Sequence, residues 1–395
     1  MADAVADARA DDALLPIVDT DPVLPGNPPG PTLNLDPTGV SESTRRRVNV
    51  LMLCDLFPLP YRVMRCCAAA GATVHVLGGS GSNGLRFSRF CHRYRRSRYE
   101  FTTPSAGMSE EINTCIGELG IDLVLAGDHG STRTLIALAP SLSAPCFPMP
   151  SLDQFDLLNN KWSFTQFCQQ LGIRCPRSEL VADRVELRRR LKSCDIAMPC
   201  IAKPLDLHGT RGVVVVKKRI DLEVVDTIEY RPILVQEYID GDDMSAAVYC
   251  DHGKIESFTA FKRKRAAYFT FQSKEIEEMA TKIVSATKVT GIFCFDMRIA
   301  GNDTTYWLEC NPRFFYSMFF SMLAGINFVA FGLPRPASNL CSFVPTGTNV
   351  RTVKAIAAEL PRPWRLTSRD TAYIRYIWAD PIPLIRESLH IDRSF

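Results

Sequence analysis

Several features that usually mark a function are missing from this sequence. None of its 14 cysteines forms a C-x-x-C pair, and no Cys/His cluster has the spacing of a zinc site. The six histidines are dispersed, and none forms an H-E-x-x-H pattern. Histidine-based metal chemistry and a disulfide framework therefore have no support, and we expect free thiols in a reducing compartment.

Long apolar runs and an excess of one charge are missing as well. The 395 residues carry 46 Lys and Arg against 43 Asp and Glu, a formal net charge of +3. No run approaches the roughly 20 apolar residues of a membrane span. Near-neutral charge gives no basis for binding nucleic acid or a membrane surface. The acidic N-terminus, MADAVADARADDALL, lacks the pattern of a signal peptide. We therefore expect a cytoplasmic protein with no nucleic-acid and no membrane partner.

Composition and periodicity predict a tail followed by an α/β domain. Residues 1–45 are rich in Ala, Asp, Pro and Gly and poor in large apolar residues, so we predict that they are disordered. Strand and helix patterns then alternate, which favours a parallel sheet with helices on its faces. The predicted strands are 48–54, 73–79 and 121–127, and the predicted helices are 62–71, 109–120 and 131–138.

Two motifs of this region have competing interpretations. The glycine cluster GGSGSNG (78–84) follows the second strand rather than the first, so it does not fit a dinucleotide-binding fingerprint. The segment 85–99 holds six Arg between Arg86 and Arg98, interleaved with aromatic residues. It is either an anion-binding patch or a solvated surface segment, and a single patch on a near-neutral chain favours the second.

The segment 291–313, GIFCFDMRIAGNDTTYWLECNPR, predicts a metal site from geometry. Its halves are strand-like, and a two-residue turn at 302–303 would place Asp296 directly opposite Glu309. Opposed Cβ atoms lie ~4.5–5.5 Å apart, where two carboxylates repel each other unless a cation lies between them. Asn311 lies on the same face as Glu309. These oxygens suit Mg²⁺, although a solvated hairpin face with fortuitous acids is the alternative.

Further motifs precede this segment in a fixed order. A helix begins at Asn160-Lys161, a strand carries Lys203-Pro, and a loop HGTRG (208–212) leads to a β-branched strand. A buried-type strand then runs into QEYIDGDD (236–243), before the paired acids and E-x-N-P-R. This order and spacing resemble the ATP-grasp superfamily, which includes biotin carboxylase, the large chain of carbamoyl-phosphate synthetase and D-alanine–D-alanine ligase. The resemblance covers about 47–330.

The resemblance implies the fold class and the domains. The chain is expected to be α/β, with a pre-ATP-grasp Rossmann-like domain followed by an ATP-grasp fold of two α+β subdomains. The implied segments are a tail (1–45), the pre-ATP-grasp domain (46–150), the ATP-grasp domain (151–345, with a lid subdomain at about 175–240) and a C-terminal extension (346–395).

The resemblance also implies a role for each matching position. Lys203 and Arg313 are the implied catalytic residues, with Arg313 offsetting charge on the transferred phosphoryl group or the substrate carboxylate. Asp296, Glu309 and Asn311 are implied to hold one or two Mg²⁺, with Mn²⁺ as an alternative. The loop 208–212 would cover the phosphates. The implied ATP-binding residues are Lys161, Lys203, His208, Gly209, Thr210, Arg211, Gly212, Gln236, Glu237, Tyr238, Ile239 and Asp243.

Two parts of the chain depart from the family pattern or lie beyond it. The basic run 262–265 lies where relatives often place a substrate- or phosphate-binding Arg; which of the four residues would serve stays open, and a solvated charge run is equally compatible. In the extension we predict a helix over 353–360. Its aromatic residues Trp364, Tyr373, Tyr376 and Trp378 are predicted to pack under the ATP-binding core.

The implied reaction is that of an ATP-dependent ligase. A carboxylate is activated as an acyl phosphate and joined to an amine, with ADP and phosphate as products. The alternatives are a small-molecule kinase on the same fold and a non-catalytic ATP-binding module. The expected partners are a small carboxylate and a small amine, and a homodimer is left open.

Overall fold

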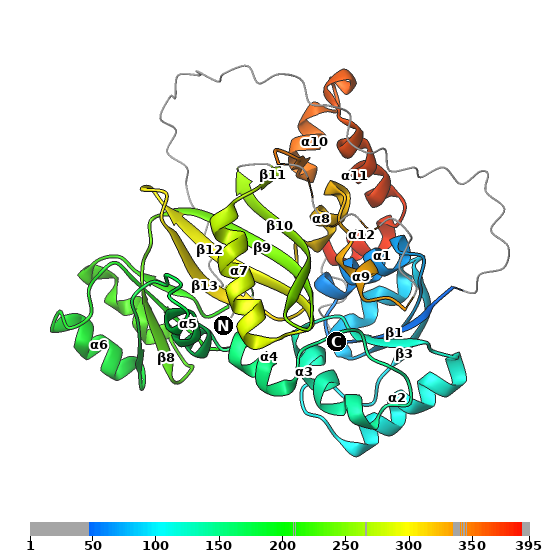
Figure 1. Ribbon diagram of the computed structural model, residues 1–395, viewed down its shortest axis with the longest axis horizontal. Helices are drawn as coiled ribbons and strands as arrows, with labels where there is room; N and C mark the ends of the chain where they lie inside the picture. The colour runs from blue at the N-terminus through cyan, green and yellow to red at the C-terminus, as the bar shows by residue number, and fades with distance from the viewer. Residues whose placement is uncertain are drawn as a thin grey trace, which may run out of the picture. The chain divides into compact units, whose positions relative to one another are not determined.

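The protein is described from a computed structural model (Figure 1). The structure describes residues 47–207, 209, 211–264, 267–334, 340, 342, 344 and 346–388. All of these lie in one compact unit, Thr44–Phe395. The predicted disordered tail, residues 1–45, lies outside the described residues, and so do His208 and Thr210 of the predicted phosphate loop.

The first sheet is parallel, as predicted, and has the strand order β3-β2-β1-β4. Its strands are β1 (Asn49–Cys54), β2 (Thr73–Gly78), β3 (Cys91–Arg96) and β4 (Leu123–Ala126). Alternate strand residues point to opposite faces, so Val50 and Met52 pack with helix α1 (Pro58–Ala69), while Leu51 and Leu53 pack with α2 (Ala106–Leu119) and α3 (His129–Leu138). Because both faces are covered, β1, β2 and β4 are largely apolar along their whole length.

The Arg-rich segment forms the edge strand β3, which the sequence did not predict. It pairs only with β2, and its polar side chains are exposed or half-buried. Arg95 forms an ion pair with Glu118 of α2 at 2.5 Å. Charged side chains are a common way to keep an edge strand from pairing with another chain. The glycine cluster 78–84 leads into a 3₁₀ helix, η1 (Ser80–Phe87).

A small antiparallel sheet, in the order β5-β8-β6-β7, lies within the predicted lid subdomain. Its strands are β5 (Ser178–Val181), β6 (Cys200–Lys203), β7 (Val214–Val216) and β8 (Ile233–Glu237). Helix α6 (Arg184–Lys192) and the 3₁₀ helix η3 (Arg219–Thr227) share a hydrophobic core with these strands. This sheet carries Lys203 and Gln236 toward the central sheet described next.

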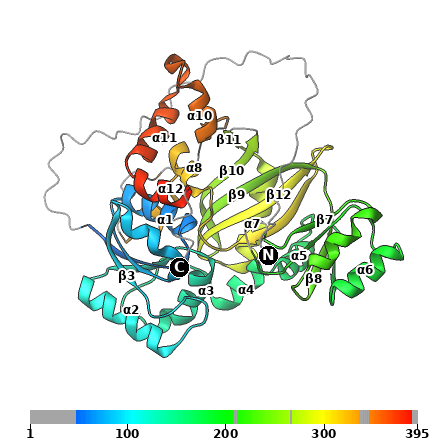
Figure 2. The same ribbon diagram turned by 180° about the vertical axis from the view of Figure 1, so that it is seen from behind.

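The central sheet is antiparallel, in the order β13-β12-β9-β10-β11-β14. Its strands are β9 (Gly241–Asp251), β10 (Lys254–Lys264), β11 (Ala267–Phe271), β12 (Gly291–Ala300), β13 (Thr305–Asn311) and β14 (Asn349–Arg351). Three helices share a core with one face, namely α4 (Leu152–Asn159), α5 (Lys161–Gln170) and α7 (Lys274–Thr287). The other face packs with α8 (Met318–Ala324) and α9 (Phe328–Phe331), whose core is continuous with that of α1. In Figure 2, α8 and α1 lie on the same side of this sheet.

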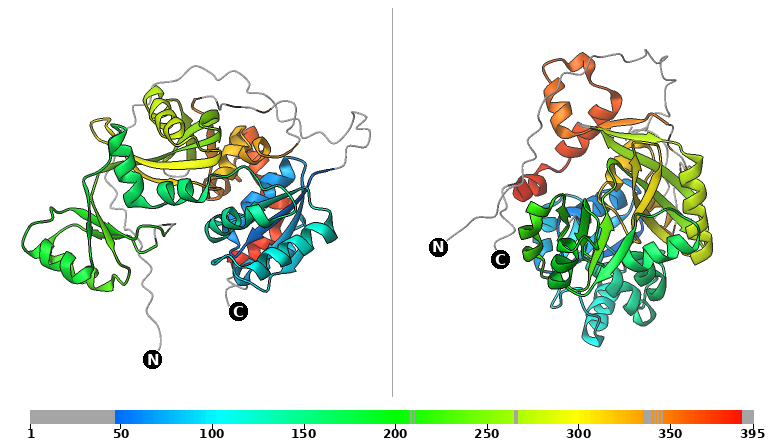
Figure 3. Two further views of the ribbon diagram at one scale, coloured as in Figure 1. Left: turned by 60° about the horizontal axis from the view of Figure 1, so that its bottom comes forward. Right: turned by 90° about the vertical axis from the view of Figure 1, so that its left-hand side faces the viewer.

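The C-terminal extension packs against the first domain and against α8 beside the central sheet. It contains α10 (Val353–Glu359), the 3₁₀ helix η4 (Pro363–Arg365), α11 (Ser368–Trp378) and α12 (Pro381–Ser388) (Figure 3). Tyr373 and Tyr376 pack against Phe319 of α8, as predicted. The prediction was wrong for Trp364 and Trp378, whose exposed fractions are 77% and 75%. On α11, Tyr373 and Trp378 are five residues apart, which places them on different faces of the helix.

Two remaining expectations concern cysteines and membranes. Within the described ranges, every cysteine is a free thiol, and most are buried. Over the same ranges, no helix combines the length and the apolar character needed to cross a membrane.

Candidate active site

Asp296 and Glu309 are directly paired in the β12–β13 hairpin, as predicted, although the turn that produces this pairing differs from the predicted one. Near the turn, Ile299 pairs with Thr305, whereas a two-residue turn at 302–303 would pair it with Tyr306. The turn is therefore one residue longer than predicted, and the register near it is shifted by one residue. The register then shifts beyond Met297, so Leu308 is an extra residue on β13. This β-bulge restores the predicted pairing.

The carboxylate of Asp296 is held by two hydrogen bonds. Ser245 Oγ donates to Oδ1 at 2.6 Å, and Asn311 Nδ2 donates to Oδ2 at 3.0 Å. Burial and the neighbouring Glu309 carboxylate raise the pKa of Asp296 to about 7, although the bond from Ser245 acts in the other direction. Two acids that differ in protonation near neutral pH are typical of a site that binds a cation or transfers a group.

Glu309 faces the two predicted lysines. Lys161 begins α5, whose N-cap is Asn160, and its Nζ lies 3.3 Å from Glu309 Oε2 and donates to the carbonyl of Leu207 at 2.6 Å. Lys203 ends β6 and is buried. Burial lowers the pKa of Lys203 to about 8, against the opposing effect of Glu309. Although burial acts to raise it, the pKa of Glu309 is lowered because Lys161 and Lys203 stabilise its charge.

Most of the predicted nucleotide-binding residues line one cavity of about 430 Å³. It lies between the small sheet and the edge of the central sheet. Apolar Ile201, Val215 and Leu308 contribute to its walls, beside the charged groups. The predicted residues that line it are Lys161, Lys203, Gly209, Arg211, Gln236, Glu237, Tyr238, Ile239, Asp243, Asp296 and Glu309. Gly212 does not line it, but its carbonyl accepts a hydrogen bond from Tyr230.

Arg298 is a cavity residue that the sequence analysis missed. Its Nε donates to Asp243 at 2.8 Å, and its guanidinium donates to the carbonyl of Ile239 at 2.8 Å. It also lies 5.4 Å from the centroid of the Tyr238 ring. Arg298 thus holds together three residues predicted for the nucleoside. Its position two residues beyond Asp296, on the same face of β12, could have indicated it.

A second cavity, of about 560 Å³, adjoins the first. The two share Asp296 and Glu309, together with Gly209, Arg211 and Asp243. Of these two cavities, only the second is lined by Asn311, Arg313, Asp128 and His129, the last two of which follow β4 of the first sheet. The acid pair is therefore accessible from both cavities.

One residue of the basic run 262–265 reaches the second cavity. Arg263 lines it, while Lys262, whose side chain alternates to the other face of β10, lies 5.8 Å from the Phe271 ring. Lys264 is exposed, and Arg265 lies outside the described residues. Of the three described positions, Arg263 is therefore the candidate for contact with an anionic group.

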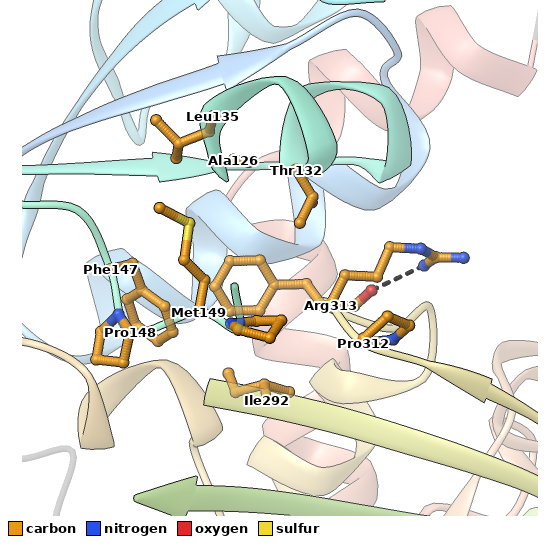
Figure 4. Close-up of a pocket in the computed structure, with 11 residues that line it drawn as sticks. Ala126, Thr132, Leu135, Phe147, Pro148, Met149, Ile292, Pro312 and Arg313 are labelled. Atoms are coloured by element: carbon orange, nitrogen blue, oxygen red, sulfur yellow. Dashed lines mark hydrogen bonds between the residues drawn. The ribbon is translucent and has the colours of Figure 1, made fainter. Parts of the chain in front are cut away.

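Arg313 links the acid pair to the first domain. Its guanidinium donates to Asn311 Oδ1 at 2.8 Å, to the carbonyl of Phe314 at 2.9 Å and to His129 Nδ1 at 3.4 Å. Arg313 also lines a small apolar cavity with Leu135 and Phe147, and in Figure 4 its guanidinium points away from the other lining residues. Burial lowers its pKa, against the opposing effect of Glu309. Arg313 is thus held beside the place where the two cavities meet.

Comparisons with known proteins agree with this arrangement. Residues 229–355 match the family model described as "ATP-grasp in the biosynthetic pathway with Ter operon". This chain has the ATP-grasp fold. The carbamoyl phosphate synthase large chain of Thermomicrobium roseum is 30% identical over 131 residues, which are 31% of this chain and 12% of the relative. The chain therefore matches only a small part of the length of that relative.

Solved structures with the ATP-grasp fold are similar over most of the chain. An L-amino acid ligase from Bacillus licheniformis has a TM-score of 0.56 at 19% identity, covering 72% of this chain and 73% of its own. The biotin carboxylase domain of Hydrogenobacter thermophilus 2-oxoglutarate carboxylase, in complex with MgADP and bicarbonate, has a TM-score of 0.58 at 14% identity, covering 77% and 74%. At such identities the likeness concerns the fold.

The predicted metal ligands in this ATP-grasp fold form a set of two carboxylates and one amide. In the described part of the chain, no group of three or more His, Cys, Asp and Glu could hold a metal ion. Mg²⁺ is often held by one or two carboxylates together with substrate phosphates. The raised pKa of Asp296 fits such an ion, because a cation would stabilise both opposed charges. The residues present therefore suit Mg²⁺ brought with a nucleotide.

Proposed function

We propose that this chain is an ATP-dependent ligase that activates a carboxylate as an acyl phosphate and joins it to an amine, releasing ADP and phosphate. One observation carries the proposal: two cavities, of about 430 and 560 Å³, meet at Asp296 and Glu309. ATP would occupy the smaller one and the carboxylate the larger one. The γ-phosphoryl group then needs to move only across the acid pair.

The nucleotide roles follow from the side chains in the smaller cavity. Lys161 and Lys203 would contact the phosphates, and the exchange of Glu309 for a phosphate would leave Lys161 a charged partner. Gln236 and the backbone of residues 237–239 would hold the adenine, while Asp243 and its partner Arg298 would hold the ribose. Gly209 and Arg211 line both cavities and would lie near the transferred group. These assignments rest on position and on chemical type.

The metal role falls to Asp296, Glu309 and Asn311. Mg²⁺ bound there would neutralise oxygen charge on the phosphates, which is the main requirement of phosphoryl transfer. Asn311 now donates to Asp296 and accepts from Arg313, and its amide would turn its oxygen toward the ion. Ser245 would keep Asp296 in place by donating to the other carboxylate oxygen.

The reaction proceeds in two steps. A carboxylate oxygen attacks the γ-phosphorus, the bond from that phosphorus to the bridging oxygen breaks, and ADP leaves. The amine nitrogen then attacks the acyl carbon, the carbon–oxygen bond to the phosphate breaks, and phosphate leaves as the nitrogen loses a proton. Arg313, and Arg263 from the other wall, would stabilise negative charge that develops on the acyl phosphate.

Trapping with hydroxylamine tests this function without knowledge of the natural amine. An acyl phosphate reacts with hydroxylamine to give a hydroxamate and phosphate, whereas a phosphate ester does not. The purified chain is incubated with ATP, Mg²⁺, hydroxylamine and a panel of carboxylic acids and amino acids, and we expect hydroxamate and ADP in equal amounts. A stable phosphorylated product without hydroxamate would favour the kinase alternative. Nucleotide binding without ADP release would favour the non-catalytic module, and AMP with pyrophosphate would overturn the site assignment.

A further inference from the structure

The second cavity is larger than a very small acid requires. Its volume is about 560 Å³, within the range of roughly 300–1,000 Å³ that is usual for sites that bind small organic ligands. The cavity proposed for the nucleotide lies beside it. An acid of the size of bicarbonate or acetate would leave most of this space filled with water, even with a small amine beside it. The volume therefore favours a larger acid.

Large apolar side chains gather in this cavity from separate parts of the fold. Leu56 and Leu59 come from the segment that begins α1, Phe261 and Tyr268 from the β10–β11 hairpin, and Phe315 and Tyr316 from the loop before α8. Leu56 and Tyr316 are 42% and 55% exposed. Single exposed apolar residues are common, but these lie in one cavity beside the acid pair.

The aromatic part of this wall is held rigid by its neighbours. Tyr268 stacks on Phe320 with ring centroids 3.9 Å apart, and Phe261 stacks on Phe315 at 6.3 Å. Arg62 lies 3.6 Å from the centroid of the Tyr316 ring and donates to the carbonyl of the same residue at 3.0 Å. Because these side chains are already held in place, they lose little conformational entropy when an apolar group binds to them.

The cavity also holds cationic groups, one beside the acid pair and one within the apolar wall. Arg313 lies next to Asp296 and Asn311, where the two cavities meet, and Arg263 pairs with Tyr268 across the β10–β11 ladder. A ligand that fits this arrangement has a carboxylate at one end and an apolar body at the other. Binding sites with a few polar groups on an apolar wall fix both position and orientation in this way.

We propose that the acid substrate of this cavity has an aromatic or branched apolar body, with its carboxylate at Arg313 and its body against Leu56, Tyr316 and Phe315. The direction of the carboxylate rests on the proposed function, whereas the apolar contact does not. This substrate class differs from the bicarbonate present in the structure of the Hydrogenobacter relative.

The test compares two acids that differ only in a phenyl group. Binding of 3-phenylpropanoate and propanoate to the full chain is measured by calorimetry in the presence of MgADP, and hydroxamate formation is measured for the same pair. We expect 3-phenylpropanoate to bind at least about tenfold more tightly, because burial of the ring removes apolar surface from water. Leu56→Asn and Tyr316→Ser should each reduce this preference by about fivefold or more.

A matched variant separates this contact from general effects. Val185 is in the first turn of α6, is 70% exposed and lies outside both cavities. Val185→Asn should therefore leave the preference unchanged. Equal binding of the two acids, no binding of 3-phenylpropanoate, or an unchanged preference in both cavity variants would overturn the inference. Hydroxamate from propanoate alone would refute the inference and support the ligase. Selective binding of 3-phenylpropanoate without hydroxamate would support the inference and count against the ligase.

Discussion

At the scale of single residues, Asp296 and Glu309 are opposed carboxyl groups fixed by strand pairing. The pKa of Asp296 is raised to about 7, so the folded chain binds this proton more tightly than the unfolded chain does. The stability that the protonated group contributes is therefore lost as the pH rises from about 4 to about 7. Above that range, two opposed carboxylates destabilise the metal-free fold.

The first prediction concerns Asp296→Asn and Glu309→Gln. Either variant should lower turnover by about a hundredfold or more, because each removes a proposed ligand of the phosphate-bound ion. In EDTA at pH 8, Asp296→Asn should raise the free energy of unfolding by up to about 1 kcal/mol, and the gain should vanish near pH 5. Urea unfolding at both pH values measures this, with the exposed Asp242→Asn as the control. Wild-type turnover in either site variant would contradict the metal assignment.

Lys203 leads to a second prediction, about proton uptake. Burial lowers its pKa to about 8, so about half of the molecules carry a neutral Lys203 at pH 8. Nucleotide phosphates favour the charged form, so at pH 8 ATP binding should make Lys203 take up roughly half a proton. At pH 6 Lys203 is already charged, and binding of ATP with Mg²⁺ should instead release the proton of Asp296. Calorimetry in two buffers of different ionisation enthalpy measures the uptake. Lys203→Arg keeps its charge and should abolish it; wild-type binding without uptake at pH 8 would count against this role.

The places of Asn311 and Lys161 could be predicted from the sequence because local patterns determine them. Strand alternation places Asn311 with Glu309, and the N-cap residue Asn160 marks where Lys161 begins its helix. His129 and Ser245 could not be predicted in the same way. His129 meets Arg313 across 184 positions and Ser245 meets Asp296 across 51, and no local pattern indicates such contacts.

At the scale of elements, the β12–β13 hairpin shows how a correct pairing can follow from an incorrect turn. The longer turn shifts the register by one residue, and the bulge at Leu308 compensates for it. Neither has a strong signal in the sequence, since Gly-Asn-Asp is compatible with several turn lengths. The edge strand β3 was missed because its arginines hide the strand pattern, and the long apolar strands were found because burial on both faces makes them conspicuous.

The bulge leads to a third prediction, which concerns the adjacent residues Trp307 and Leu308. Leu308 and Glu309 both line the cavity proposed to bind the nucleotide, whereas Trp307 is 2% exposed and belongs to the core behind the sheet. Leu308→Ala should weaken ATP binding about fivefold, since it removes apolar contact with the nucleotide. Trp307→Ala should instead lower the free energy of unfolding by about 3–5 kcal/mol. Nucleotide titration and urea unfolding of both variants separate the two roles, and the reverse assignment of effects would show that the bulge is misplaced.

At the scale of the whole molecule, the extension connects regions that are far apart in the sequence. Tyr373 and Tyr376 of α11 pack on Phe319 beside the central sheet, while Arg65 of α1 donates to the carbonyl of Tyr376 at 2.5 Å. The sequence predicted the aromatic packing but gave no indication of the contact with the first domain. Such contacts depend on the path of the entire chain, and helical periodicity shows only which face of a helix is apolar.

Asp380, between α11 and α12, provides the last prediction. It is 3% exposed; its carboxylate accepts from Ser88 Oγ and from the backbone N–H of Arg89 at 3.0 Å, and its carbonyl accepts from the Tyr61 hydroxyl at 3.1 Å. Asp380→Ala removes both carboxylate bonds and leaves buried donors unpaired, so we expect a loss of about 2–3 kcal/mol in the free energy of unfolding.

The matched control for Asp380→Ala is Asp195→Ala, which removes an exposed carboxylate bonded to Ser193 and should cost less than about 0.5 kcal/mol. Urea unfolding followed by circular dichroism measures both variants. Because Asp380 lies outside both cavities, the affinity of the folded variant for MgADP should remain within about twofold of wild type, provided that the measurement is made where the variant is fully folded. Equal stability of the two variants would show that the contacts of Asp380 contribute little to holding the first domain. The hydrophobic core that the first domain shares with α8 and α9 would then be sufficient.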